Sequence, residues 1–376
     1  MMGLQNTIQY LVDAGMHPAQ TVHGSLAESG REAIGCFPSF APEELVYAAG
    51  FLPVGMWGGK TGYTHADKYM QSFACPVMRA NLEFGITGTY RMLRAVLVPT
   101  LCDTLKCMCE NWKTAVPDIP VIGISYPQNR MDAVAKRQLM AELNRIKAEL
   151  EQLSGTPITE AVLGESLQVY DAFREAINHF TAVSGQHSTT INAKTRHYIL
   201  KASYFMDKAE YTRLLNALTD SLTARPMDSY LGLKVVATGI MVDSEALLDL
   251  LDEHGITIVS DALLHESGQF QALHEGTGSA LEQIAERYLR INGISLLYEP
   301  RKPRGAMLAE LVRKSGADAV IAFMMKFCDP EEFDYPIYQK ELTRAGIPVL
   351  QIEIDQVVDS IEQIRTRLQT FIEMLI

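Results

Sequence analysis

The sequence of 376 residues predicts an α/β fold with two Rossmann-like domains, each a doubly wound parallel sheet, and a helical middle region between them. Three observations lead to this prediction. Short apolar runs alternate with helical stretches in residues 1–130 and again in residues 226–376. Residues 131–225 keep helical spacing and lose the strand pattern. The order strand, Cys-Asp, helix, Ile-Pro-Val, strand also occurs twice, although βαβ units can converge on this order without a repeat.

The expected elements follow in chain order. In the N-terminal domain, residues 1–130, strands are expected over 33–37, 51–56, 95–101 and 121–126. A helix over 42–50 separates the first two, with Pro42 in its first turn and Gly50 at its end. The helical region, residues 131–225, should contain helices over 137–153, 169–180 and 198–222. In the C-terminal domain, residues 226–376, strands are expected over 233–240, 256–260, 294–298, 319–325 and 348–354, and a last helix over 360–376.

Two cysteines share one local setting. Cys102 and Cys328 each end an apolar run, and each is followed by an aspartate, Asp103 or Asp329, which we expect to be a helix N-cap. Open α/β sheets carry their chemistry at the carboxyl ends of the strands. Two thiols delivered to that edge in matching positions therefore suggest a shared ligand, and a metal cluster in the cleft between the domains is the candidate.

Cys75 is the expected third ligand. Pro76 suits the first turn of a helix, so Cys75 should lie at a helix N-terminus, where the dipole favours a thiolate. Three protein thiolates on a [4Fe–4S] cluster leave one iron open. Zinc is the rival metal, but no second cysteine pair and no histidine at structural-zinc spacing follows.

The remaining cysteines leave alternatives open. Cys107 lies just over one helical turn beyond Cys102, so it either reaches the same cluster or packs behind it, while Cys109 should point elsewhere. Cys36 follows a strand and either lines the cleft or fills the core. We expect Cys36, Arg79, Asp103, Cys107 and Asp329 to surround the ligands, and we name no catalytic residue.

The bulk properties exclude several classes of protein. A net charge of −12 argues against a nucleic-acid surface, which needs clustered positive charge. No stretch reaches roughly 18 uninterrupted apolar residues, and residues 1–20 carry no signal-peptide pattern. No G-x-G-x-x-G follows a strand, so a dinucleotide site is not supported. We therefore expect a cytoplasmic protein with reduced cysteines, no membrane segment and no nucleic-acid partner.

Six segments carry a resemblance to a known family: GCFPSFAPEELVYAAGFLPVGMWG, FACPVMR, CDTLKCMCENWK, YPQNR, MMKFCDPEEFDYP and IEIDQVVDSIEQIRTRLQTFIEML. Together they resemble the ATP-dependent (R)-2-hydroxyacyl-CoA dehydratases, which include lactyl-, 2-hydroxyglutaryl- and 2-hydroxyisocaproyl-CoA dehydratases and, more distantly, benzoyl-CoA reductases. The match runs from about residue 30 to the C-terminus. The chain is most similar to the smaller, β-type subunit.

The resemblance implies a hydro-lyase subunit with an iron–sulfur cofactor. It implies a heterodimer with a homologous α subunit, and a [4Fe–4S] cluster held by Cys75, Cys102 and Cys328. A separate ATP-dependent iron–sulfur activator would supply one electron. The CoA thioester substrate would bind mainly in the α subunit, where a ketyl radical loses water to give the (E)-2-enoyl-CoA. This chain would relay the electron.

Departures from the family pattern keep alternatives open. Gly268 stands where the family has an arginine, and Cys109 is an additional cysteine. The number of cysteines, six, equals the number expected for a double-cubane-cluster protein, which is one alternative. A benzoyl-CoA-reductase-like reductase subunit and a non-catalytic electron-docking scaffold are two others. His265 is expected to be a surface or hydrogen-bonded residue, not a ligand.

Overall fold

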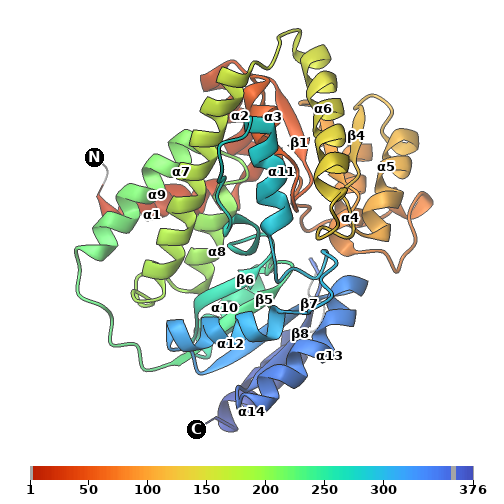
Figure 1. Ribbon diagram of the computed structural model, residues 1–376. Coiled ribbons are helices and arrows are strands. Elements are labelled where there is room, and N and C mark those ends of the chain that lie inside the picture. Colours follow the sequence, from red (N-terminus) through yellow and green to blue (C-terminus); the bar gives the residue numbers. More distant parts are fainter. Residues whose placement is uncertain (1–2, 357–360, 376) are drawn as a thin grey trace.

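The computed structural model describes residues 3–356 and 361–375. These residues form two four-stranded sheets, in which all strand pairs are parallel, and fourteen α-helices (Figure 1). The predicted α/β class is therefore confirmed. The predicted strands are present with small shifts at their ends, except for residues 294–298.

The first sheet has the strand order β2-β1-β3-β4. Every residue of β1 and β2 is buried, as expected for parallel strands covered on both faces. The bounds are β1 (Ala33–Cys36), α3 (Glu43–Ala48), β2 (Leu52–Gly55), η1 (Ala66–Lys68), α4 (Pro76–Thr87), β3 (Leu93–Pro99), α5 (Asp103–Ala115) and β4 (Val121–Ile124).

The second sheet repeats this order as β6-β5-β7-β8. Each of its strands thus takes the place of its counterpart in the first sheet, and β7, which precedes Cys328, matches β3, which precedes Cys102. The bounds are β5 (Leu233–Gly239), α10 (Glu245–Glu253), β6 (Ile256–Leu263), η2 (Gly268–Phe270), α11 (Ala280–Arg290), α12 (Arg304–Ser315), β7 (Ala319–Met325), α13 (Asp329–Arg344), β8 (Val349–Ile354) and α14 (Ile361–Glu373).

Most of the other helices form a group beside the two sheets, whereas α6 packs against α11, α3 and β4 (Figure 1). The two N-terminal helices, α1 and α2, were not predicted from the sequence. Helix α1 packs against α8 and α9, and α7 and α8 contact β6. One apolar core runs from the first sheet through this group to β5 and β7. The exact domain boundaries remain a prediction. The bounds are α1 (Leu4–Met16), α2 (Pro18–Ser29), α6 (Ala135–Ser154), α7 (Glu160–Ser184), α8 (Ala193–Ala202) and α9 (Lys208–Thr223).

Residues 294–298 are a loop, so the strand predicted there is wrong. Two of their apolar side chains are buried without strand partners: Ile294 is 5% exposed and Leu297 4% exposed. The loop is closed by Glu299, whose carboxylate accepts hydrogen bonds from the backbone N–H of Gly293 at 3.1 and 3.0 Å. A short apolar run does not distinguish a strand from a buried loop.

The continuous helix predicted over 198–222 is also wrong, because α8 and α9 are separated by residues 203–207. Asp207 caps the second helix by accepting hydrogen bonds from the N–H groups of Ala209 and Glu210. This break places Tyr204 against the second sheet, where its hydroxyl donates to the carbonyl of His265 at 2.7 Å. The predicted C-terminal helix is confirmed over Ile361–Glu373, and the next two residues form a turn, while Ser360 and Ile376 lie outside the described residues.

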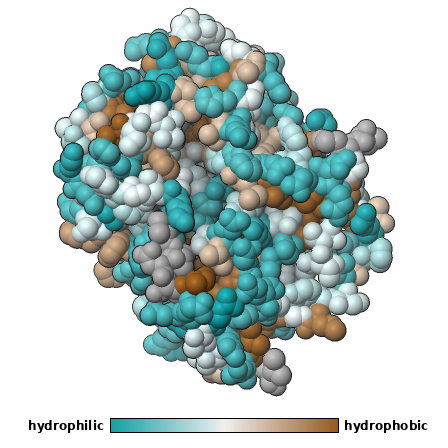
Figure 2. Space-filling view, turned by 180° about the vertical axis from the view of Figure 1, so that it is seen from behind, coloured by the Kyte–Doolittle hydropathy of each residue, from teal (hydrophilic) through white to brown (hydrophobic). Residues whose placement is uncertain are grey.

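The surface carries few large apolar areas on the face seen in Figure 2, where hydrophilic residues predominate and apolar residues form small separate patches. None of the helices in the described part of the chain combines the length and the apolar composition that crossing a bilayer requires.

Candidate functional site

A cavity of about 370 Å³ lies where the strand ends of the two sheets meet. Its wall includes Ser39, which follows β1, and Ile240, which follows β5. Cys102 and Cys328, which follow β3 and β7, also line the cavity. The order of strands reverses between β1 and β3 in the first sheet and between β5 and β7 in the second. The cavity therefore lies at the topological switch point of both sheets.

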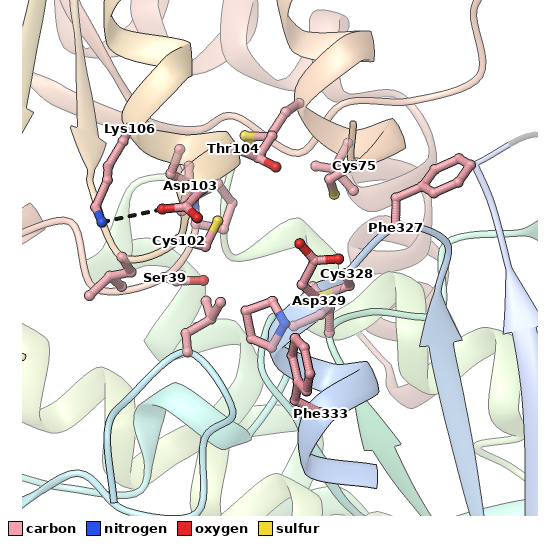
Figure 3. Close-up of a pocket in the computed structure, with 18 of the residues that line it drawn as sticks. Ser39, Cys75, Cys102, Asp103, Thr104, Lys106, Phe327, Cys328, Asp329 and Phe333 are labelled. Carbon is pink, nitrogen blue, oxygen red and sulfur yellow. Dashed lines mark hydrogen bonds and ion pairs between the residues drawn. The ribbon is translucent and has the colours of Figure 1, made fainter. Parts of the chain in front are cut away.

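The structure brings three of the predicted cysteines to this cavity (Figure 3). Cys75, Cys102 and Cys328 are the N-cap residues of α4, α5 and α13, and Pro76 occupies the first turn of α4 as predicted. Three helix N-termini therefore converge on one space. Each contributes positive partial charge and free backbone N–H groups, which favour anionic sulfur.

The prediction that Asp103 and Asp329 are N-caps is wrong. Both are the first residue of their helix, and the cysteine before each is the N-cap because its backbone is still non-helical. The side chain of Asp103 is 93% exposed and pairs with Lys106 at 3.3 Å. An acidic residue in the first turn still complements the helix dipole, which explains why aspartate suits these positions without capping them.

Burial dominates the acidity of the three thiols. It raises the pKa of Cys75 to about 12, although backbone N–H groups of Val77 and Met78 act in the opposite direction. Burial also raises the pKa of Cys102 and of Cys328. The free thiols are therefore protonated near neutral pH, and a metal that binds them must displace their protons.

The donor set suits a cluster better than a single metal ion. Among residues 3–356 and 361–375, no group of three or more His, Cys, Asp or Glu side chains is close enough to hold one ion. A cluster presents several irons at separate corners, so its thiolate ligands stand farther apart. Apolar side chains of Leu101, Ile240 and Leu296 form part of the wall. Three soft sulfur donors around a partly apolar space fit an iron–sulfur cluster.

The backbone is strained beside the cavity. Ser39, Phe40 and Phe327 have φ values of 103°, 67° and 59°, a region that non-glycine residues rarely adopt. Tyr126 donates a hydrogen bond to the carbonyl of Phe40, and Gln269 accepts one from its N–H at 3.4 Å. Such strain is typical of functional sites, where the surrounding contacts hold it in place.

The other predicted site residues lie around the cavity or away from it. Cys36 is buried in the core, Cys107 is exposed on α5, and Cys109 is buried near Gly123 of β4; none of the three lines the cavity. Arg79 braces the segment before Cys75, since it donates to Asp67 at 2.5 Å and to the carbonyl of Ser72 at 3.1 Å.

Gly268 is enclosed by backbone. A Cβ atom at this position would lie 2.8 Å from the carbonyl oxygen of Leu263, so a side chain would require the backbone to shift. The arginine that the resemblance led us to expect at this position would therefore fit only with a shift of the backbone near Leu263.

Sequence reasoning missed the position of His265. It is 3% exposed and lines the cavity, and its buried Nδ1 atom has no hydrogen-bond partner among the described residues. The expectation of a surface or hydrogen-bonded histidine is thus wrong. The available signal was its place after the second strand of the second unit, at the carboxyl edge of the sheet.

A buried ionic network lies next to His265 and joins α8 to the second sheet. Arg196 is 1% exposed; it donates to Glu266 at 2.6 Å and also pairs with Asp261. His197 bridges Glu266 at 2.8 Å and Asp243 at 3.1 Å. Lys201 and the indole N–H of Trp57 also donate to Asp243, at 2.8 Å and 2.7 Å.

The family model of the 2-hydroxyglutaryl-CoA dehydratase D-component matches residues 38–375. The chain is 40% identical over 378 residues to the lactoyl-CoA dehydratase subunit beta of Anaerotignum propionicum, covering 100% of both chains. It is 38% identical over 359 residues to the (R)-phenyllactyl-CoA dehydratase beta subunit of Clostridium sporogenes, covering 96% of each.

A third relative extends this likeness. The chain is 36% identical over 363 residues to the (R)-2-hydroxyglutaryl-CoA dehydratase, subunit beta, of Acidaminococcus fermentans, covering 95% of this chain and 96% of the relative. All three relatives are named as dehydratase subunits, and dehydratases are hydro-lyases. The resemblance inferred from the sequence segments is thereby confirmed.

Proposed function

Because the chain belongs to the 2-hydroxyglutaryl-CoA dehydratase D-component family, we propose that it is the β-type subunit of an ATP-activated (R)-2-hydroxyacyl-CoA dehydratase. In this proposal Cys75, Cys102 and Cys328 hold one [4Fe–4S] cluster. The chain pairs with a homologous α subunit, as the naming of its relatives as beta subunits suggests. The assembly works in the cytoplasm, where thiols stay reduced.

One observation carries the proposal. Three thiols from segments far apart in the sequence, each the N-cap of a helix, face one cavity between the two sheets. A cluster bound there would accept and pass on one electron. The three helix N-termini would stabilise its negative charge.

The proposed reaction converts an (R)-2-hydroxyacyl-CoA into water and an (E)-2-enoyl-CoA. A proton on the β carbon of a thioester is not acidic, so direct elimination is blocked. One electron from the ATP-dependent activator reduces the thioester carbonyl to a ketyl radical anion, which expels the α-hydroxyl as hydroxide. The β proton is then acidic and leaves to complete the water molecule, and the electron is returned, so no net oxidation or reduction occurs.

The residues of this chain have supporting roles in that reaction. The substrate binds mainly in the α subunit, and this chain relays the electron. Leu101, Ile240 and Leu296 limit the access of water to the thiols, which protects a low-potential centre. The chain itself supplies no proposed acid or base.

The double-cubane alternative has less support. That assembly would need most of the six cysteines at one place, yet Cys36 and Cys109 are in the core and Cys107 is exposed on α5. The observed placement favours one smaller cluster with three ligands.

The test is an iron and sulfide analysis of the chain, purified anaerobically together with an α subunit. We expect about four irons for this chain, brown colour and charge-transfer absorption. Cys328→Ser should lose most of this iron and the dehydration of 2-hydroxyacyl-CoA. Cys107→Ser is the matched control, since this thiol is exposed and outside the cavity, and it should keep both.

Other results would contradict the proposal in distinct ways. Colourless wild-type chain without iron would indicate a scaffold without a cluster. About eight irons for this chain would favour the double-cubane alternative. Full activity of the Cys328→Ser complex would show that this thiol is not a ligand.

A further inference from the structure

The loop between α11 and α12, residues 291–303, leads from one half of the molecule to the other (Figure 1). At its start, α11 packs against α6 and α7, and α6 contacts β4 of the first sheet. At its end, α12 packs against β5, β6 and β7 of the second sheet. Leu296, within this loop, lines the cavity. The loop therefore passes beside the site on its way between the two halves.

Arg130 fastens the start of this loop to the first half. The residue is 7% exposed and follows β4. Its guanidinium donates to the carbonyls of Leu289 and Ile291 and, at 3.2 Å, to the carboxylate of Glu299. Carbonyls at the end of a helix lack intrahelical donors, so the arginine caps α11. Glu299 also accepts from the N–H of Gly293, so the same arginine holds the closed loop.

Ser295 fastens the same loop to the second half. Its hydroxyl donates to the carboxylate of Glu331 at 2.6 Å, and Arg304 donates to the same oxygen at 2.7 Å. Glu331 is 1% exposed and lies in the first turn of α13, the helix that Cys328 caps. Burial raises the pKa of the Cys328 thiol, and a hydrogen bond from the backbone N–H of Glu331 acts in the opposite direction. The contacts of the loop therefore reach one predicted ligand.

The segment that carries Arg130 also supports Cys102. This segment begins at the end of β4, where the carbonyl of Ile124 accepts hydrogen bonds from the N–H and the hydroxyl of Thr100, at 2.8 and 2.9 Å. Thr100 lies just before Cys102 in the chain. A continuous set of contacts thus joins the wall that carries Cys102 to the wall that carries Cys328.

We infer that Arg130 and residues 291–299 form a strap that fixes the separation of the Cys102 wall from the Cys328 wall, and that the chain needs this strap to retain a bound cluster. Arg130 is a positioning residue in this inference, not an iron ligand. The inference rests on the proposed function, which places the cluster between these walls. A [4Fe–4S] cube has fixed dimensions, so its ligands tolerate little change in their separation, and groups that hold metal ligands in place strongly affect metal affinity.

The experiment is a chelator challenge of the anaerobically purified complex. After each interval this chain is separated from the α subunit and its iron is counted. Arg130→Met keeps the apolar length of the side chain and removes both the cap of α11 and the pair with Glu299. We expect this variant to lose iron at least about tenfold faster than the wild type, because supports of metal ligands typically have effects of this size. Ser295→Ala, which cuts the strap at its other end, should also speed the loss of iron.

Arg174→Met is the matched control. Arg174 is a buried arginine of α7, 3% exposed, that pairs with Glu44 and Asp171 and does not line the cavity. Its substitution should destabilise the fold but leave the rate of iron loss close to that of the wild type. Thermal melting of each variant measures the general loss of stability, so that an effect on iron is compared between variants of similar stability.

A double variant distinguishes one strap from two separate supports. Because Arg130 and Ser295 act through the same loop, Arg130→Met combined with Ser295→Ala should lose iron no faster than Arg130→Met alone. Hydrogen exchange of the cluster-free chain gives a readout that needs no iron. Arg130→Met should speed exchange in peptides that cover residues 328–338 of α13, whereas Arg174→Met should not, since α13 is reached only through the strap.

The outcomes separate this inference from the proposed function. Wild-type chain without iron would refute the proposed function, and hydrogen exchange alone would then decide whether the strap exists. With iron-loaded wild type, equal rates of iron loss for Arg130→Met and Arg174→Met would overturn the inference alone. A wild-type rate for Ser295→Ala, additive effects in the double variant, or unchanged exchange over residues 328–338 in Arg130→Met would also overturn it.

Discussion

Removing the positive charge of Arg196 should strongly destabilise the protein. Its guanidinium is 1% exposed and lies between Asp261 and Glu266, which are 3% and 2% exposed. Arg196→Met keeps a similar apolar length but leaves two buried carboxylates without this partner. Breaking a buried pair in this way costs about 3–5 kcal/mol. Because Glu266 keeps its hydrogen bond to His197, we expect a loss in the lower part of that range.

The loss is measured as the change in the free energy of unfolding in urea, with the wild type and the variant compared at the same pH. The control is Arg313→Met, since Arg313 is an exposed residue of α12 that pairs with Glu310 within one helical turn. We expect little change there, because exposed ion pairs contribute little.

A triple variant tests the cause of the loss. Arg196→Met combined with Asp261→Asn and Glu266→Gln removes the uncompensated charges, so most of the lost stability should return. Stability of Arg196→Met within about 1 kcal/mol of the wild type would refute the reasoning. A triple variant less stable than the single one would show that packing, not charge, explains the effect.

Three further predictions concern stability and can be checked by the same unfolding measurements. Burial lowers the pKa of His197, but its hydrogen bonds to two carboxylates outweigh burial and raise this pKa above the usual value of 6.5. The contribution of His197 to the free energy of unfolding should therefore be complete below pH 6.5 and should be lost as the pH rises through the folded-state pKa. His197→Gln should remove this pH dependence. Gly268→Ala should lower the free energy of unfolding by about 1–3 kcal/mol, because the new Cβ meets a backbone carbonyl. Gly164→Ala, in the interior of α7, should raise it by about 0.5–1 kcal/mol, because no atom lies within 4 Å of the new Cβ. Equal effects at the two sites would contradict this reasoning. Phe327 has a φ of 59°, so Phe327→Gly should be about 1–2 kcal/mol more stable than Phe327→Ala. The opposite order of stability would show that the backbone at this position is not strained.

The fold was largely predictable because the chain has strong local signals. The strand over 319–325 was placed with its exact ends, since seven consecutive apolar residues are buried on both faces of the sheet. The loop over 294–298 is also mostly apolar but is closed by a carboxylate from Glu299, a contact that no local pattern reveals. The break between α8 and α9 depends on Asp207 as a cap within an otherwise helical sequence.

The candidate site was predictable where residues follow strands in a recognisable order. Cys102 and Cys328 share their context, so their meeting at one cavity follows from the repeat. His265 is not marked by a repeated sequence pattern, and its position in the cavity wall depends on contacts with Trp57 and Tyr204, which are distant in sequence. The exposure of Cys107 and the burial of Cys109 likewise depend on how α5 lies against β4, which the spacing of the two residues does not determine.

The division of the cavity between two equivalent sheets has a consequence for biosynthesis. A nascent chain that has emerged only through β4 already contains Cys75 and Cys102, but the opposite wall and Cys328 are still to be synthesised. The site therefore comes into being only when the second sheet has folded and docked, late in translation. If the proposed cluster is present, its iron can be bound by all three thiols only from that moment, and a chain truncated before α13 lacks the wall that carries Cys328.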